Sequence, residues 1–163
     1  MMRVGMGIDV HALAEGRPLI LGGVTVPHSV GLSGHSDGDT LTHAVVDALL
    51  GAAGMGDIGG RFPSTDEVYR SADSLTFLSA IAPELADAGW SVQNVDATII
   101  AQRPTLSPFV KEMQANIARA LAIDPGLINV KATTSDRLGM AGREEGIAAF
   151  AVALLERRES PDR

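Results

Sequence analysis

Strand-like and helix-like segments alternate along this chain, and their order is the strongest constraint on its fold. Residues 4–11 alternate with the two-residue period of a strand, and residues 18–26 predict a hairpin that turns at Gly22 and Gly23. The remaining patterns predict helices and strands in the order helix (36–52), helix (71–88), strand (92–102), helix (107–121) and strand (128–134). This order predicts a single α+β domain in which one sheet packs against one layer of helices.

The clearest helix has an apolar stripe made of Leu41, Val45, Ala48, Leu49 and Ala52. We expect it to begin near Ser36 or Asp37, since both residue types are good N-caps. The glycine-rich segments on either side, residues 31–38 and 51–60, predict loops or tight turns.

Two other segments are harder to interpret. Pro83 falls inside the helical pattern of residues 71–88, where it predicts a kink or a break, and Gly89 is the expected stop. Residues 147–155 are apolar throughout, so their pattern fits a helix and a buried strand equally well.

Composition limits the classes of function. The chain has 163 residues and a net charge of −7, with only two lysines and no basic run, which argues against nucleic acid and anionic membranes as partners. It has no cysteine, which excludes disulfides and thiolate chemistry. The first residues lack the apolar stretch of a signal peptide, so we expect a cytoplasmic protein. We expect one domain over residues 1–156 and a frayed tail over residues 157–163.

The four histidines all lie within the first 43 residues, which points to one N-terminal site. Asp9 and His11 leave the same face of the predicted strand, and His43 lies on the polar face of the following helix. Two imidazoles and one carboxylate suit Zn²⁺ with a fourth position open to substrate. Asp39 or Asp47 would orient the imidazole of His43. The alternative is that these side chains are ordinary surface polar groups.

Three further segments carry polar groups that could bind a phosphorylated ligand. Residues 34–39 combine glycines, a hydroxyl and a helix N-terminus, which can cradle a phosphate, but they also fit a simple capped loop. Residues 57–66 contain carboxylates in a glycine-rich loop that could bind sugar hydroxyls or face solvent. Residues 133–136 end a strand with three hydroxyls and a carboxylate, which fits a diphosphate with Mg²⁺ or a plain polar loop.

Taken in order, these segments resemble the 2-C-methyl-D-erythritol 2,4-cyclodiphosphate synthase family of the non-mevalonate isoprenoid pathway. The resemblance runs over residues 3–155 without a large gap. It is carried by residues 7–11, 34–51, 56–59, 62–63, 94–104, 130–134, 142–143 and 145–149. The resemblance implies a two-layer sandwich of one mixed sheet with helices on one face, which assembles as a homotrimer with shared active sites. It also implies that residues 147–155 form a strand.

The resemblance further implies a reaction and its cofactors. A CDP substrate, 4-diphosphocytidyl-2-C-methyl-D-erythritol 2-phosphate, would be cyclised with loss of CMP. Asp9, His11 and His43 would bind Zn²⁺, or Mn²⁺ or Co²⁺ in its place. Asp136 would bind Mg²⁺ or Mn²⁺ at the diphosphate. His35 and Thr134 would act in catalysis by stabilising the transition state.

The resemblance assigns the remaining contacts to four groups of residues. Besides Asp9, His11 and His35, the methylerythritol end would contact Ser36, Asp57, Ile58, Gly59, Phe62, Pro63, Ser64, Thr65 and Asp66. The cytidine would contact Ala101, Gln102, Arg103, Pro104, Thr105, Leu106 and Ser107. The phosphates would contact Thr133, Thr134, Ser135 and Asp136. An isoprenoid diphosphate in a central cavity of the trimer would lie near Met140 and Arg143.

Two other classes of protein fit the same residues. A metal-dependent phosphoesterase would use the same ligands but release inorganic phosphate. A non-catalytic module that binds nucleotides or isoprenoid diphosphates would turn over no CDP substrate.

Overall fold

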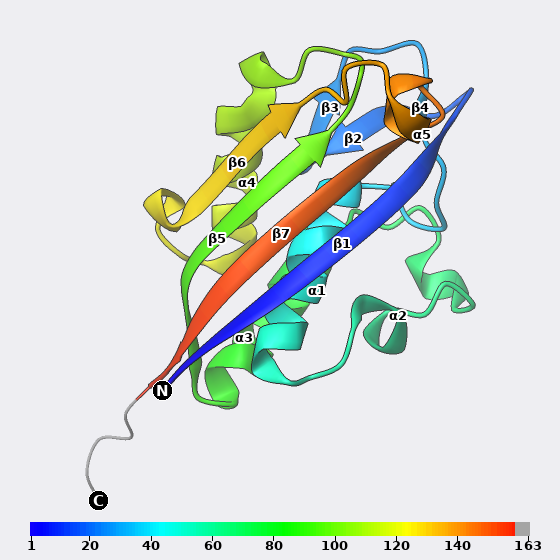
Figure 1. The fold of residues 1–163 in the computed structure, drawn as a ribbon. Coiled ribbons are helices and arrows are strands. Elements are labelled where there is room, and N and C mark those ends of the chain that lie inside the picture. The colour runs from blue at the N-terminus through cyan, green and yellow to red at the C-terminus, as the bar shows by residue number, and fades with distance from the viewer. Residues whose placement is uncertain (159–163) are drawn as a thin grey trace, which may run out of the picture.

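A computed structural model describes residues 1–158, which form a five-stranded mixed sheet with helices on one face (Figure 1). The strand order is β4-β1-β7-β5-β6, and only β5 and β6 run parallel. The two-layer α+β prediction is therefore confirmed. The strands are β1 (Met2–Ala14), β4 (Gly31–Leu32), β5 (Trp90–Ile100), β6 (Ile128–Thr133) and β7 (Gly146–Arg157), and a separate hairpin pairs β2 (Leu19–Leu21) with β3 (Val24–Val26).

Three helices cover the sheet: α1 (Thr40–Ala53), α3 (Leu75–Asp87) and α4 (Val110–Leu121). Pro83 lies inside α3 without ending it, and Gly89 follows the helix with a positive φ of 80°. Shorter helices occupy the loops: α2 (Ile58–Arg61), α5 (Gly139–Gly142) and the 3₁₀ turns Glu67–Tyr69, Ser107–Phe109 and Pro125–Leu127. The glycine-rich segment 51–60 is thus more helical than predicted, and residues 31–38 include the short strand β4.

The undecided apolar segment near the C-terminus is the central strand β7, as the resemblance implied. It pairs with β1 on one side and with β5 on the other. Its alanines Ala149, Ala151 and Ala153 are fully or almost fully buried under the helices. Small side chains here let a helix lie close to the sheet, so pairing and close packing outweigh the helix propensity of alanine.

Helix α1 lies directly on β1, and this contact determines where the polar side chains of both elements meet. A Cβ on Gly5 would lie 2.1 Å from the carbonyl oxygen of Ala48. The apolar stripe predicted for the helix is buried. The start of the helix differs from the prediction, because Asp39 rather than Ser36 or Asp37 is the N-cap.

A long-range contact explains why Asp39 caps the helix. Its carboxylate accepts the N–H of Thr42 at 2.9 Å, as an N-cap does, and also the N–H groups of Gly22 and Gly23 at 2.9 and 2.8 Å. Asp39 is fully buried, so these bonds join the start of α1 to the hairpin turn. A local sequence pattern does not contain that information.

Within residues 1–158, no helix covers the other face of the sheet, which is apolar along β1 and β7. Its large exposed side chains are Met2, Val4, Met6, Ile8, Val10, Phe150 and Val152. An exposed patch of this kind marks an interaction surface more often than a free one.

Two features concern the chain as a whole. Strand β7 continues through Arg157, and the backbone N–H of Arg158 donates to Gly89, whereas residues 159–163 of the expected tail lie outside the described residues. Within residues 1–158, every helix is too short or too polar to cross a membrane.

Candidate metal and substrate site

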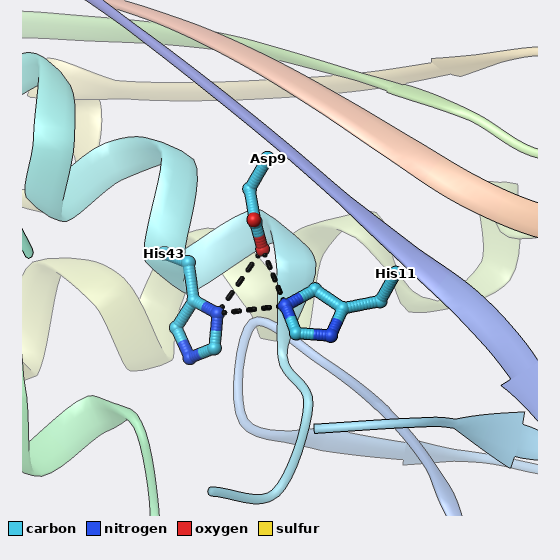
Figure 2. A group of neighbouring side chains, drawn as sticks. All are labelled: Asp9, His11 and His43. Atoms are coloured by element: carbon cyan, nitrogen blue, oxygen red, sulfur yellow. Dashed lines mark hydrogen bonds and ion pairs between the residues drawn. The ribbon is translucent and has the colours of Figure 1, made fainter. Parts of the chain in front are cut away.

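Asp9, His11 and His43 converge on one point between β1 and α1 (Figure 2). Asp9 Oδ2 lies 2.8 Å from Nε2 of His11 and 3.1 Å from Nδ1 of His43, and the two nitrogens are 3.2 Å apart. Asp9 and His11 leave the same face of β1, as their spacing predicted, and His43 reaches them from the first turns of α1. The predicted grouping of these three side chains is therefore confirmed.

The outward-facing ring nitrogens have partners of their own. Nδ1 of His11 bonds to the backbone carbonyl of Ser33, and Nε2 of His43 lies 2.8 Å from Oγ of Ser74. When the protons of the neutral rings point to these partners, both inward nitrogens present lone pairs beside the carboxylate of Asp9. Three electron-rich atoms in contact favour a cation between them.

The pKa values of Asp9 and His11 also indicate a site that favours positive charge. Burial opposes ionisation of Asp9, but hydrogen bonds and electrostatic attraction from His11 and His43 outweigh it and hold the pKa of Asp9 well below its usual value. Burial likewise opposes protonation of His11, yet its hydrogen bond with Asp9 and their attraction raise the pKa of His11. The pocket therefore attracts positive charge.

The geometry also fits a metal ion. A tetrahedral zinc with bonds of about 2.0–2.1 Å holds its ligand atoms about 3.3–3.4 Å apart. The observed separations of 2.8, 3.1 and 3.2 Å need only a slight widening to reach that spacing. Two imidazoles and one carboxylate leave a fourth position open, as in catalytic zinc sites.

The open side of the group faces a pocket of about 220 Å³. Of the residues expected to bind the methylerythritol end, it brings together His35, Ser36, Ile58, Gly59, Phe62 and Ser64 next to the metal group. It leaves Asp57, Pro63, Thr65 and Asp66 outside the lining. Asp57 instead caps α2 by accepting the N–H of Gly60, and Asp66 contributes its backbone carbonyl, 2.9 Å from Nε2 of His35.

Sequence reasoning missed two aromatic residues in this pocket, Tyr69 and Phe77. Phe77 stacks on Phe62 with ring centroids 4.4 Å apart, meets Tyr69 edge-on at 5.7 Å, and lies 6.2 Å from the ring of His43. These contacts give the metal group an apolar wall. Phe77 belongs to the apolar face of α3, so the sequence pattern indicated a core residue only.

The prediction that Asp39 or Asp47 orients the imidazole of His43 is wrong. The carboxylate of Asp39 faces the hairpin turn, and Asp47 accepts the backbone N–H of Ile58 at 2.7 Å. The imidazole of His43 contacts hydroxyl groups instead, with Ser74 Oγ at 2.8 Å and Ser36 Oγ at 3.2 Å. Ser74 was not predicted because it lies 31 residues from His43, at the start of another helix.

A second pocket, of about 380 Å³, lies at the β5–β6 edge of the sheet. Of the predicted residues its lining contains Ala101, Gln102, Pro104, Thr105, Leu106, Ser107, Thr133 and Thr134. Val110, Lys131 and Ala132 also line it and were not predicted. Arg103 does not line it, and its guanidinium lies 3.5 Å from Glu144.

The other predicted residues lie between β6 and β7, outside both pockets. Asp136 is exposed and has a φ of 51°, and one of its carboxylate oxygens lies 3.3 Å from Oγ1 of Thr134. Ser135 donates its hydroxyl to the carbonyl of Leu138. Met140 lies in α5 and lines neither of these two pockets. The guanidinium of Arg143 binds the carboxylate of Glu145.

Comparison with known proteins assigns the chain to a family. The model of the YgbB family matches residues 2–156. The chain belongs to the YgbB family. Among curated members, it is 59% identical to the 2-C-methyl-D-erythritol 2,4-cyclodiphosphate synthase of Bordetella bronchiseptica over 95% of this chain and 96% of that protein. The synthase of the same name from Syntrophomonas wolfei is 57% identical, over 95% and 99%.

Solved structures of YgbB-type domains share the fold. The bifunctional IspDF of Campylobacter jejuni superimposes with a TM-score of 0.93 at 43% identity over 98% of this chain, which spans 43% of that longer protein. The IspF of Plasmodium falciparum in complex with CDP gives a TM-score of 0.85 at 36% identity, over 97% of each chain. These identities are high enough that the likeness extends beyond the fold.

Proposed function

We propose that this YgbB-family chain is a 2-C-methyl-D-erythritol 2,4-cyclodiphosphate synthase. It converts 4-diphosphocytidyl-2-C-methyl-D-erythritol 2-phosphate to 2-C-methyl-D-erythritol 2,4-cyclodiphosphate and CMP. The observation that carries this proposal is the convergence of Asp9, His11 and His43 beside a pocket, in a chain whose relatives bear the name of that synthase. The catalytic unit is the domain of residues 1–156, and it works in the cytoplasm.

The reaction joins two anionic groups of one substrate. An oxygen of the 2-phosphate attacks the β-phosphorus of the CDP group, and CMP leaves, so a new P–O bond replaces the one to CMP. A divalent ion on Asp9, His11 and His43 would supply positive charge that offsets the repulsion between the two phosphates. Zn²⁺ suits this donor set, and Mn²⁺ or Co²⁺ are the alternatives.

The protein's own residues hold the two reacting ends. Binding both ends of one molecule removes the entropy cost of their encounter, which is worth about 7–11 kcal/mol in ideal cases. The pocket beside the metal group, with His35 and Ser36, would hold the methylerythritol phosphate, and the pocket at the β5–β6 edge would hold the cytidine. The solved relatives that contain CDP support a cytidine nucleotide as the ligand, and the pocket at the β5–β6 edge is lined by most of the residues expected to contact it.

The residues proposed for the phosphates lie at the end of β6. Thr134 would donate its hydroxyl to the diphosphate. His35, in the pocket beside the metal group, would stabilise negative charge that develops in the transition state. Asp136 would bind Mg²⁺ or Mn²⁺ together with phosphate oxygens. One exposed carboxylate fits this role, because Mg²⁺ usually takes one or two carboxylates and completes its shell with phosphate and water.

We propose that the active unit is a homotrimer with shared active sites. The two pockets lie at β1 and at β6, with β7 and β5 between them in the sheet. If the β6 edge of one subunit lies beside the β1 edge of the next, one substrate reaches both pockets. The apolar open face of β1 and β7 supplies the surface that such an assembly needs to bury.

An isoprenoid diphosphate is the proposed ligand of the central cavity of that trimer. It would lie near Met140 and Arg143. The guanidinium of Arg143 is bound to Glu145 at 2.8 and 3.0 Å, so an entering diphosphate would compete with this ion pair.

One incubation tests the proposed reaction. The protein is mixed with the CDP substrate, Mg²⁺ and Zn²⁺, and the products are separated and identified. CMP and the cyclic diphosphate in equal amounts are the expected result. Release of inorganic phosphate would indicate a phosphoesterase instead, and an unchanged substrate would indicate a binding module.

A further inference from the structure

Three side chains form a hydrogen-bonded chain behind the metal group, and two of them, His43 and Ser74, are buried, whereas Asp37 is partly buried. Nε2 of His43 lies 2.8 Å from Oγ of Ser74, and that hydroxyl makes a short hydrogen bond to Oδ1 of Asp37. Ser74 is fully buried and His43 is 8% exposed. The second carboxylate oxygen of Asp37 accepts the backbone N–H of Ser74 at 3.0 Å, which fixes the carboxylate relative to the serine.

The chemistry of the three groups gives this chain a direction. An ionised carboxylate only accepts hydrogen bonds, so the single proton of the Ser74 hydroxyl points to Asp37. The oxygen of Ser74 then has only lone pairs to offer His43, so Nε2 of His43 must carry the proton. In a neutral imidazole the other nitrogen, Nδ1, is then free of a proton, and Nδ1 is the atom that faces Asp9 and His11.

We infer that Ser74 and Asp37 are positioning residues that select the tautomer of His43, so that Nδ1 is held ready for the metal ion. This inference rests on the proposed function only in taking the site to be a metal site. Neither residue contacts the metal group's inward atoms. Their effect passes through the ring of His43, in the way that outer partners of metal-bound histidines act.

The neighbouring hydroxyl of Ser36 does not provide the same control. Its oxygen lies 3.2 Å from Nε2 of His43 and 3.3 Å from Oγ of Ser74, and because a hydroxyl can donate as well as accept, these contacts impose no direction on the proton of His43. Within residues 1–158, the Ser36 hydroxyl makes no hydrogen bond to Asp37. The direction of the chain therefore comes from Asp37.

Two variants separate the hydroxyl from the direction that the carboxylate imposes. Ser74→Ala removes the acceptor of the Nε2 proton. Asp37→Asn keeps the shape, but the amide can donate to Ser74, which turns the serine proton toward His43 and favours a proton on Nδ1. Ser79→Ala is the control, because its hydroxyl lies on the exposed side of α3 and donates to the carbonyl of Leu75.

The first measurement is the Zn²⁺ dissociation constant of the full chain, by competition with a chromophoric chelator. We expect about a 10–100-fold weaker affinity for Ser74→Ala and for Asp37→Asn. Ser79→Ala should match the wild type. Urea unfolding of each variant, done alongside, identifies a loss of affinity that comes from a loss of fold.

The second measurement needs no metal. In ¹⁵N-histidine-labelled metal-free protein, with His43 neutral, long-range ¹H–¹⁵N spectra report which ring nitrogen carries the proton. The inference predicts a proton on Nε2 in the wild type and a shift toward Nδ1 in Asp37→Asn. A wild-type proton on Nδ1, or an Asp37→Asn variant with wild-type tautomer and wild-type zinc affinity, would overturn it. A protein that shows the predicted tautomers but turns over no CDP substrate would contradict the proposed function alone.

Discussion

Gly7 lies so close to Ala44 that a Cβ on the glycine would be 2.0 Å from the alanine's carbonyl oxygen. This contact fixes the distance between β1 and α1 right beside the metal group. Asp9 and His11 follow Gly7 on the strand, and His43 precedes Ala44 on the helix. The packing of backbone on backbone therefore brings the three ligands together.

Gly7→Ala should damage both the fold and the metal site. The added methyl group must push α1 away from β1, which we expect to lower the free energy of unfolding by about 1–3 kcal/mol and to weaken zinc binding. Urea denaturation and zinc titration measure the two effects. Gly51→Ala is the matched control, since its Cβ would meet no atom and alanine should stabilise the helix by about 0.5–1 kcal/mol. Wild-type stability and zinc affinity in Gly7→Ala would contradict this account.

The faces that carry the ligands were predictable because they depend on local periodicity, whereas the convergence of the ligands also needs β1 to pack on α1. The two-residue period of a strand puts Asp9 and His11 on one face, and the helical pattern puts His43 on the side away from the stripe. The partners of these ligands were not predictable in the same way. Ser74 reaches His43 from another helix, and Asp47 is engaged by the N–H of Ile58.

In the fold, too, local patterns predicted some features, and contacts between residues distant in sequence decided others. The order of the elements followed from their patterns, whereas the start of α1 depends on bonds between Asp39 and the turn at Gly22 and Gly23. Strand β7 could not be separated from a helix by its own residues. Its pairing with strands on both sides, which are distant in sequence, decides its conformation.

Asp39→Asn should lower the stability of the protein, although Asp39 lines neither of the two proposed substrate pockets. The amide nitrogen would face at least one of the backbone N–H groups that the buried carboxylate accepts, which leaves donors unpaired. We expect a loss of about 2–4 kcal/mol in the free energy of unfolding. The control is Asp124→Asn, at an exposed aspartate that caps a 3₁₀ turn, where the loss should be below about 1 kcal/mol. Equal effects in chemical denaturation would refute the role given to Asp39.

His43→Ala should abolish turnover while the fold remains. The variant loses one of three ligands, so the site should no longer retain the metal ion. Product formation, metal content and circular dichroism are the measurements. His28→Ala is the control, because His28 lies on the loop after β3 and lines neither pocket. Full activity of His43→Ala with no bound metal would show that the site has another role.

Thr134→Ala should slow the chemical step more than it weakens substrate binding. Its hydroxyl is proposed to meet charge that develops during the reaction, and such contacts act on the transition state. The single-turnover rate should fall about 100-fold or more, with a small change in the substrate dissociation constant. Thr25→Ala, at an exposed position of β3, should leave both values unchanged. An unchanged single-turnover rate in Thr134→Ala would count against its proposed role.

The most direct test of the metal site is anomalous diffraction at the zinc edge from crystals of the zinc-loaded protein. The account predicts one strong peak at about 2.0–2.2 Å from Asp9 Oδ2, His11 Nε2 and His43 Nδ1. A peak bound elsewhere, or none between these three atoms at full zinc occupancy of the protein, would contradict it.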